Sequence, residues 1–195
     1  MRLQASRSTG ADPLTLCFGA TACFAFLPAA SDKSAGTTDM NVRTFNSEIW
    51  LPQPPEEIFP FFADAANLEA ITPPWLNFRI LTPAPVVMGE GTLIDYKLRV
   101  RGLPMRWRTR ISAWEPPYRF VDEQLRGPYR QWVHEHTFTP QDGGTLARDA
   151  VRYAVAFDFL VERWLVRPDV ERIFHYRLEV LRRRFSGLRS AKGER

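Results

Sequence analysis

The feature that most constrains the fold is a β-hairpin predicted between Arg130 and Tyr153. Its first strand is RQWVHEHTFTP, its turn is QDGG and its second strand is TLARDAVRY. Successive side chains of a strand point to opposite faces. One face of the first strand therefore carries Trp132, His134, His136 and Phe138. Asp142, Gly143 and Gly144 tolerate positive φ and let the chain reverse. The return strand gathers on one side Thr145, Ala147, Asp149, Val151 and Tyr153. Aromatic rings mixed with ionisable groups predict a sheet face that lines a cavity.

The remaining pattern predicts one strand, two short helices, a run of strands and a final helix. Alternation and turn residues predict strands over Thr44–Leu51, Phe78–Leu81, Thr92–Val100, Met105–Trp114 and Tyr118–Leu125. Helices are predicted from Pro55 through Phe62, over Asn67–Ile71 and over Pro168–Phe185, with a loosely helical or irregular segment before the last one. The hydrophobic face of such an antiparallel meander must be covered, and only the last helix is long enough. We therefore expect an α+β fold with a hollow between sheet and helix.

This order resembles the helix-grip fold of the SRPBCC superfamily, which includes START, Bet v 1 and polyketide cyclase/dehydrase proteins. The resemblance rests on PPEEIFPFFADAANLEAITPPWLNFRI, on WVHEHTFTPQDGGTLARDAVRY and on VRPDVERIFHYRLEVLRRRF, and it runs from about Asn41 to Phe185. Within the superfamily, the chain is most similar to the small bacterial branch often described as coenzyme Q-binding START-like. The resemblance implies a curved sheet wrapped round the last helix, with a cavity for a hydrophobic ligand and no shared catalytic motif.

Three segments follow from the changes in composition. Residues 1–40 run from polar and basic to apolar to small residues, which fits a weak secretory signal or a misassigned start upstream of Met40. Residues 41–186 form the predicted ligand-binding domain, and 187–195 a basic tail. We expect a cytoplasmic protein, with export or membrane anchoring as the alternative if residues 1–30 act as a signal.

The polar candidates are His134, His136 and Asp149 from the hairpin. Two imidazoles at positions i and i+2 project the same way, with Asp149 on the paired strand. Three interpretations stay open: a satisfied buried network, polar groups that orient a ligand or transfer protons, and a two-histidine-one-carboxylate metal site. The first is the commonest arrangement, and we expect no metal and no cofactor.

Asp122 and Gln124 alternate with Phe120 on the preceding strand. Periodicity leaves open whether that face or the face of Val121, Glu123 and Leu125 points inward, because both are half apolar. The family resemblance favours Phe120, Asp122 and Gln124 inward, which would bring a carboxylate close to the histidines.

Aromatic residues make up 13% of the chain, a large ring volume for one core. The rings expected to line a pocket are Tyr96, Trp107, Trp132, Tyr153 and Phe174. The competing interpretation of each ring is plain core.

The opposite faces of two strands carry a basic run made of Lys97, Arg99, Arg101, Arg106, Arg108 and Arg110. These cations fit either a solvated face that pairs with Glu123 and Glu135 or a surface for peripheral contact with an anionic membrane or a partner. The net charge of +4 and the lack of interleaved surface aromatics argue against nucleic-acid binding.

The sequence therefore predicts a protein that binds a small hydrophobic molecule, such as a lipid, an isoprenoid quinone or a polyketide-like aromatic, as a carrier or sensor. Two alternatives remain: a cyclase or dehydratase that uses His134, His136 and Asp149 as acid and base, and an interaction module that uses the basic face. The sequence does not indicate an oligomeric state.

Overall fold

The structure is a computed structural model that describes residues 41–155 and 159–186. Its strands are β1 (Arg43–Leu51), β2 (Arg79–Ile80), β3 (Leu93–Val100), β4 (Leu103–Glu115), β5 (Arg119–Arg126), β6 (Gln131–Gln141) and β7 (Gly144–Ala154). Its helices are α1 (Pro55–Phe62), α2 (Asn67–Ala70), η1 (Pro74–Leu76), α3 (Phe159–Val161), η2 (Glu162–Val166) and α4 (Arg167–Ser186). The segments predicted over 1–40 and 187–195 lie outside the described residues.

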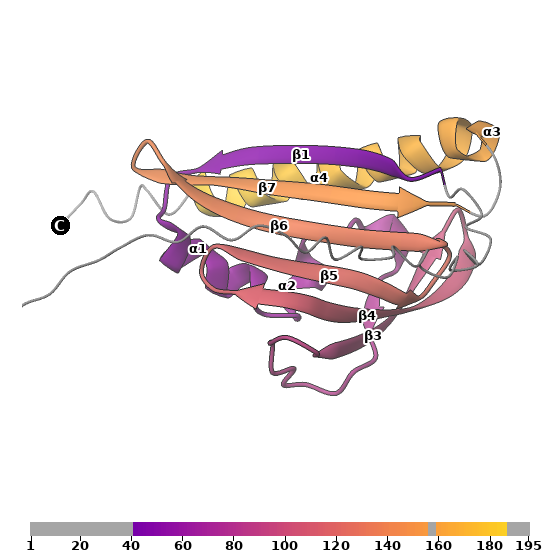
Figure 1. Ribbon diagram of the computed structural model, residues 1–195, viewed down its shortest axis with the longest axis horizontal. Coiled ribbons are helices and arrows are strands. Elements are labelled where there is room, and N and C mark those ends of the chain that lie inside the picture. Colours follow the sequence, from indigo (N-terminus) through magenta and orange to yellow (C-terminus); the bar gives the residue numbers. More distant parts are fainter. Residues whose placement is uncertain (1–40, 156–158, 187–195) are drawn as a thin grey trace, which may run out of the picture. The chain divides into compact units, whose positions relative to one another are not determined.

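All seven strands form one antiparallel sheet in the order β1-β7-β6-β5-β4-β3-β2. The neighbours from β2 to β7 are consecutive in the chain, as expected for strands joined by short turns. Strand β1 pairs with β7, and α1 and α2 lie between β1 and β2 in the chain. Figure 1 shows the curved sheet with α4 running along it. The predicted α+β helix-grip architecture is confirmed.

The β6–β7 hairpin adopts the predicted alternation. Its turn is two residues long, with φ of 50° at Asp142 and 71° at Gly143, and Gln141 pairs directly with Gly144. Positive φ at both turn positions matches the right-handed twist of the flanking strands. Gly144 begins β7 instead of belonging to the turn, and a Cβ there would lie 2.3 Å from the carbonyl oxygen of Leu51. Only glycine fits where the end of β1 passes so closely.

Helix α4 covers the inner face of the sheet over about 30 Å, the length of 20 helical residues. Its buried side chains are Val170, Phe174, Leu181 and Phe185. At one end it joins what we call the sealed core, a group of buried side chains that line no cavity: Ile49, Leu51, Ile58, Phe59, Phe138, Ala147, Leu181 and Phe185. This core anchors the helix to β1, β6, β7 and α1.

The segment before α4 was predicted to be loosely helical or irregular. Its described part is helical, with the short helix α3 followed by the π-helical turn η2. Glu162 in η2 is buried and accepts a hydrogen bond of 2.9 Å from the hydroxyl of Tyr153 on β7. No helix in the described part of the chain is long and apolar enough to cross a membrane.

Candidate functional site

A cavity of about 190 Å³ lies between the inner face of the sheet, the helices that follow β1, and α4. Its wall is mostly aromatic and aliphatic. The lining residues on the sheet include Ile94, Tyr96, Leu98, Trp107, Thr109, Ile111, Phe120, Asp122, Trp132, His134 and His136. The helices contribute, among others, Phe61, Phe62, Leu68, Val170, Phe174 and Arg177. An apolar hollow with a few convergent polar groups is the usual form of a small-molecule site.

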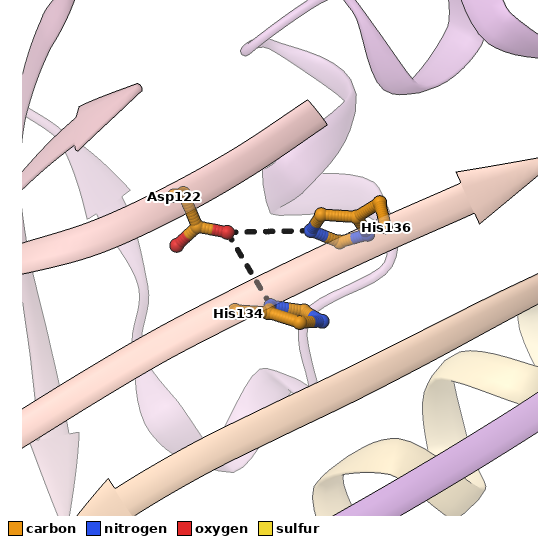
Figure 2. A group of neighbouring side chains, drawn as sticks. All are labelled: Asp122, His134 and His136. Carbon is orange, nitrogen blue, oxygen red and sulfur yellow. Dashed lines mark hydrogen bonds and ion pairs between the residues drawn. The ribbon is translucent and has the colours of Figure 1, made fainter. Parts of the chain in front are cut away.

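Four ionisable side chains on three adjacent strands form what we call the polar cluster: Asp122, His134, His136 and Asp149. The strand register produces it, because Asp122 on β5 is directly opposite His134 on β6, and His136 is directly opposite Asp149 on β7. Figure 2 shows the carboxylate of Asp122 facing both imidazoles. Its Oδ2 lies 3.4 Å from His134 Nδ1 and 3.3 Å from His136 Nε2.

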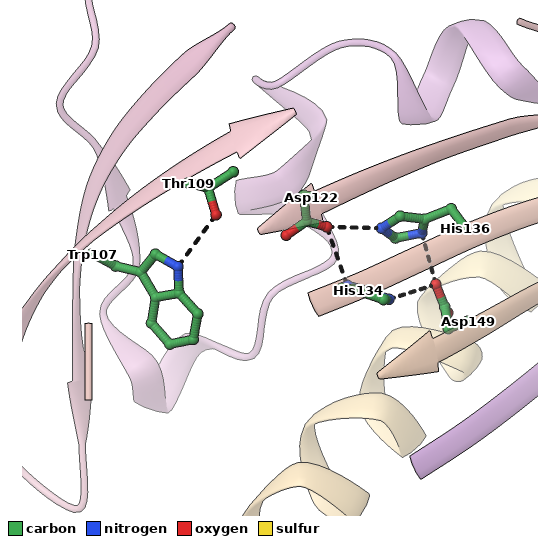
Figure 3. A network of polar contacts seen from close by, with 6 residues as sticks. All are labelled: Trp107, Thr109, Asp122, His134, His136 and Asp149. Carbon is green, nitrogen blue, oxygen red and sulfur yellow. Dashed lines mark hydrogen bonds and ion pairs between the residues drawn. The ribbon is translucent and has the colours of Figure 1, made fainter. Parts of the chain in front are cut away.

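Asp149 holds the two imidazoles from the other side. Its Oδ1 lies 3.0 Å from His134 Nε2 and 2.7 Å from His136 Nδ1. Figure 3 shows the resulting chain of contacts, with a carboxylate at each end and the histidines between them. Each histidine therefore has one nitrogen toward each carboxylate, and both ring orientations are fixed.

Aromatic rings enclose the histidines. Phe120 stacks on His136 with ring centroids 4.1 Å apart, and Phe174 meets His134 edge-on at 5.4 Å. His134 and His136 are 5% and 3% exposed, so water screens their charges little.

The pKa values of the two histidines shift in opposite directions. Burial lowers the pKa of His134, and repulsion from His136 adds to this, so the carboxylates do not restore its ordinary value. Burial also acts against the charge on His136, but attraction to Asp149 and the hydrogen bond to Asp122 raise its pKa overall. Of the two imidazoles, His136 therefore takes up a proton more readily than His134.

Both carboxylates stay ionised. Burial alone would raise the pKa of Asp149, but the charges of Arg177 and His136 and the hydrogen bond with His134 hold it well below its ordinary value. Burial acts the same way on Asp122, and the two histidines lower its pKa in turn.

This arrangement can move a proton. A neutral imidazole carries one ring proton, so His134 can donate to only one of its two carboxylates. The hydrogen bond of 3.0 Å between His134 Nε2 and Asp149 Oδ1 favours Asp149 as that partner. Two imidazoles whose pKa values shift in opposite directions, at the wall of an apolar cavity, offer a candidate base in His134 and a candidate acid in His136.

The same group has the composition of a metal site. Single ligand atoms from Asp122, His134 and His136 all lie within 4.8 Å of one another, and two histidines with one carboxylate suit divalent transition metals. The carboxylate of this triad is Asp122; Asp149, which the sequence pattern had suggested, lies behind the imidazoles as an orienting group. The expectation of no metal stays a prediction.

Most of the predicted ligand-binding residues surround the cavity, namely Tyr96, Trp107, Phe120, Asp122, Trp132, His134, His136 and Phe174. The orientation of β5 that the family resemblance favoured is correct for Phe120 and Asp122. That these residues bind a ligand stays a prediction.

Gln124 does not line the cavity. Its side-chain amide binds the backbone of Tyr129: Nε2 donates to the carbonyl oxygen at 2.7 Å, and Oε1 accepts from the amide N–H at 3.4 Å. Gly127 makes this close approach feasible, because a Cβ there would fall 2.1 Å from Gln124 Oε1. Gln124 thus closes the loop between β5 and β6.

Asp149 and Tyr153 also stand back from the cavity. The histidines separate Asp149 from it, and the hydroxyl of Tyr153 is bound to Glu162. Both residues support the wall from behind: Asp149 orients the imidazoles, and Tyr153 packs with Val151, Val170 and Phe174.

Arg177 is the charged residue of the cavity wall that is not among the predicted ligand-binding residues. The helical spacing of Val170, Phe174, Leu181 and Phe185 places Arg177 on the buried face of α4. Arginine is rare on buried faces unless it is paired. A cation among the apolar residues of this helix face is the signal that the sequence offers.

The outer basic face is partly paired. Arg108 binds Asp95 and Arg110 binds Glu123, at 2.8 and 2.9 Å, whereas Glu135 pairs with Arg119, which is outside the predicted run. Within the described residues, Lys97, Arg99 and Arg106 have no ion pair. Contact of this face with a partner or an anionic membrane stays a prediction.

Comparison with known proteins is consistent with this architecture. The family model for polyketide cyclase/dehydrase and lipid transport proteins matches residues 51–182. No curated protein matches the chain. Among solved structures, protein Ms6760 from Mycobacterium smegmatis is 19% identical, with a TM-score of 0.57 over 74% of this chain and 92% of that one.

Two further structures share the fold at low identity. The Zhui aromatase/cyclase from Streptomyces is 17% identical, with a TM-score of 0.57 over 72% of this chain and 91% of that one. The major latex-like protein 151 from Panax ginseng is 10% identical, with a TM-score of 0.54 over 74% and 97%. Because the family model spans well over half of the sequence, the chain belongs to the polyketide cyclase/dehydrase and lipid transport family, of the SRPBCC type.

Proposed function

We propose that the protein binds a small, largely apolar molecule in this cavity and acts as its carrier or sensor. One observation carries the proposal: an aromatic-lined hollow has Asp122, His134 and His136 on one wall. Burial of about 200 Å² of apolar ligand surface would contribute about 5 kcal/mol before the cost of association. The polar wall would orient the ligand through a few hydrogen bonds.

The size of the cavity narrows the ligand class. At about 190 Å³ it is smaller than the roughly 300–1,000 Å³ of pockets that enclose drug-sized molecules. This favours a compound of about two fused rings or a short chain over a complete isoprenoid quinone or a diacyl lipid, whose tail would have to extend outside.

The binding proposal is tested by filling the cavity. Leu98 on β3 is buried and lines the cavity, whereas Leu125 on β5 is exposed and does not line it. In native mass spectrometry of protein purified from its own host, we expect a bound small molecule in wild type and in the control Leu125→Trp. We expect it to be missing from Leu98→Trp. Equal retention by both variants, or a wild-type protein that binds neither a host molecule nor naphthalene-sized probes, would contradict the proposal.

A second candidate function is a cyclase or dehydratase reaction. The opposite pKa shifts of the neighbouring His134 and His136 favour it, because such a pair offers a candidate base and a candidate acid at the same wall. The family includes cyclases and dehydrases as well as lipid transport proteins. In a carrier, His134→Phe should keep ligand affinity. In an enzyme, His134→Phe should abolish turnover of the identified ligand, and the wild-type rate should depend on pH near the histidine pKa values.

A further inference from the structure

Arg177 is a cation on the inner face of α4, between Phe174 and Leu181. It is partly buried and lines the cavity on the helix side. Long cationic side chains are seldom placed on a buried helix face unless something there pairs with them.

Within the described part of the chain, Arg177 has no such partner. None of its nitrogens makes a hydrogen bond or ion pair with another described residue, and its Nε is buried without an acceptor. The charge is close enough to lower the pKa values of Asp122 and Asp149, but neither carboxylate is at ion-pair distance. A buried donor without an acceptor is destabilising. A ligand oxygen that accepts a hydrogen bond from Arg177 would therefore remove this cost.

Other arginines on α4 show what a satisfied side chain looks like. Arg167 binds Glu171 at 2.9 Å, and Arg183 binds Glu179 at 3.1 Å. Arg172 is exposed and lies 4.3 Å from the ring centroid of Trp75. Among the described residues, Arg177 has only the ring of Phe174, at 5.8 Å, the outer limit for a cation–π contact.

We propose that Arg177 is a ligand-binding residue that receives the carboxylate of a compact, planar, apolar acid. The inference rests on the proposed function, because it names the chemical class that the cavity takes. A guanidinium presents a rigid fork of donors that matches a carboxylate with two parallel hydrogen bonds. The apolar body of such an acid would lie among the rings of the sheet, and its carboxylate would point toward α4.

Two probes that differ only in their polar group test the proposal: 2-naphthoate and 2-methylnaphthalene. Binding to the full-length protein is followed at pH 7 by quenching of the cavity tryptophans Trp107 and Trp132. The variants are Arg177→Met, which removes the donors, Arg177→Lys, which keeps a charge but loses the fork, and the control Arg172→Met on the same helix.

We expect wild type and Arg172→Met to bind 2-naphthoate at least tenfold more tightly than 2-methylnaphthalene. Arg177→Met should lose about tenfold to a hundredfold in affinity for 2-naphthoate and keep its affinity for 2-methylnaphthalene, and Arg177→Lys should fall between. Should Arg177→Met fail to fold, the loss in Arg177→Lys carries the test.

Equal affinity of wild type for both probes, or equal loss of both in the Arg177 variants, would overturn the role of Arg177 and leave the proposed function standing. Failure of the wild-type protein to bind either probe would instead overturn the proposed function, and this inference with it.

Discussion

The sealed core and the cavity wall share the same strand and the same helix. On β6, Phe138 belongs to the core, whereas His136, two residues earlier, belongs to the wall. On α4, Leu181 belongs to the core, and Arg177, one turn earlier, faces the cavity. The two regions are therefore neighbouring stretches of one inner surface with different chemistry.

Burial does not separate the two regions. Phe138 is 2% exposed and His136 is 3% exposed. In the core, Phe138 and Phe59 meet edge-on at 5.6 Å, and apolar side chains can adjust until the space is filled. In the wall, hydrogen bonds fix the histidines between two carboxylates, so these side chains cannot close the hollow. The comparison separates a region that stabilises the fold from one that keeps space available.

The largest expected effect of a single change is in the sealed core. Phe138→Ala should cost about 4 kcal/mol in the free energy of unfolding, from lost burial and the cavity left behind. Urea denaturation measures it. A loss below about 2 kcal/mol would mean that this end of the sheet is loosely packed, and the contrast between the regions would then fail.

A slightly smaller loss is expected where the wall is held from behind. Asp149→Ala leaves the two buried imidazoles with only one of their two shared carboxylates, Asp122, and should cost about 3 kcal/mol. The pKa of His136, followed by NMR, should fall because its main stabilising charge is gone. An unchanged His136 pKa would show that Asp149 does not control the pair.

The pH dependence of stability distinguishes the histidines. The raised pKa of His136 gives stability that is complete below pH 6.5 and is lost as the pH rises through its folded-state pKa. The lowered pKa of His134 acts oppositely: its contribution is present above pH 6.5 and is lost as the pH falls through its folded-state pKa.

Together these opposite slopes predict greatest stability near pH 6.5. Urea midpoints measured from pH 5 to pH 9 test this. His136→Gln should remove the decline on the alkaline side. A wild-type profile that rises steadily up to pH 9 would show that the pKa of His136 is not raised in the folded protein.

The smallest effect is expected on the outer face. Arg110→Ala breaks the exposed pair with Glu123 and should cost about 0.5 kcal/mol, since water and salt screen such pairs. Probe binding in the cavity should not change. A loss as large as that of Asp149→Ala would place the outer face among the stabilising regions.

The sequence pattern was most informative where local rules dominate. Strand alternation and the Asp142-Gly143 turn predicted the hairpin, its inward face and thus the neighbours His134, His136 and Asp149. Helical spacing predicted α4 to within one residue at each end. For these elements, the period and the turn chemistry leave few alternatives.

The sequence pattern did not predict side-chain positions that depend on contacts with another strand, loop or helix. Periodicity placed Gln124 on the same face as Asp122 but could not show that its amide turns to the backbone of Tyr129. The alternation likewise grouped Asp149 with the wall, although the imidazoles of β6 lie between it and the cavity. Arg177 lines the cavity because α4 packs against the sheet. This is a tertiary contact that local sequence spacing does not predict.

The central claim is that the cavity end of this inner surface admits a small ligand and that the sealed core does not. Methyl NMR tests this claim most directly. The protein is labelled at Ile and Leu methyl groups and titrated with 2-methylnaphthalene. We predict shift changes and intermolecular NOEs for the cavity residues Ile94, Leu98 and Ile111. None are expected for the sealed-core residues Ile49, Ile58 and Leu181. NOEs to the sealed core, or shifts spread evenly over both groups, would contradict the account.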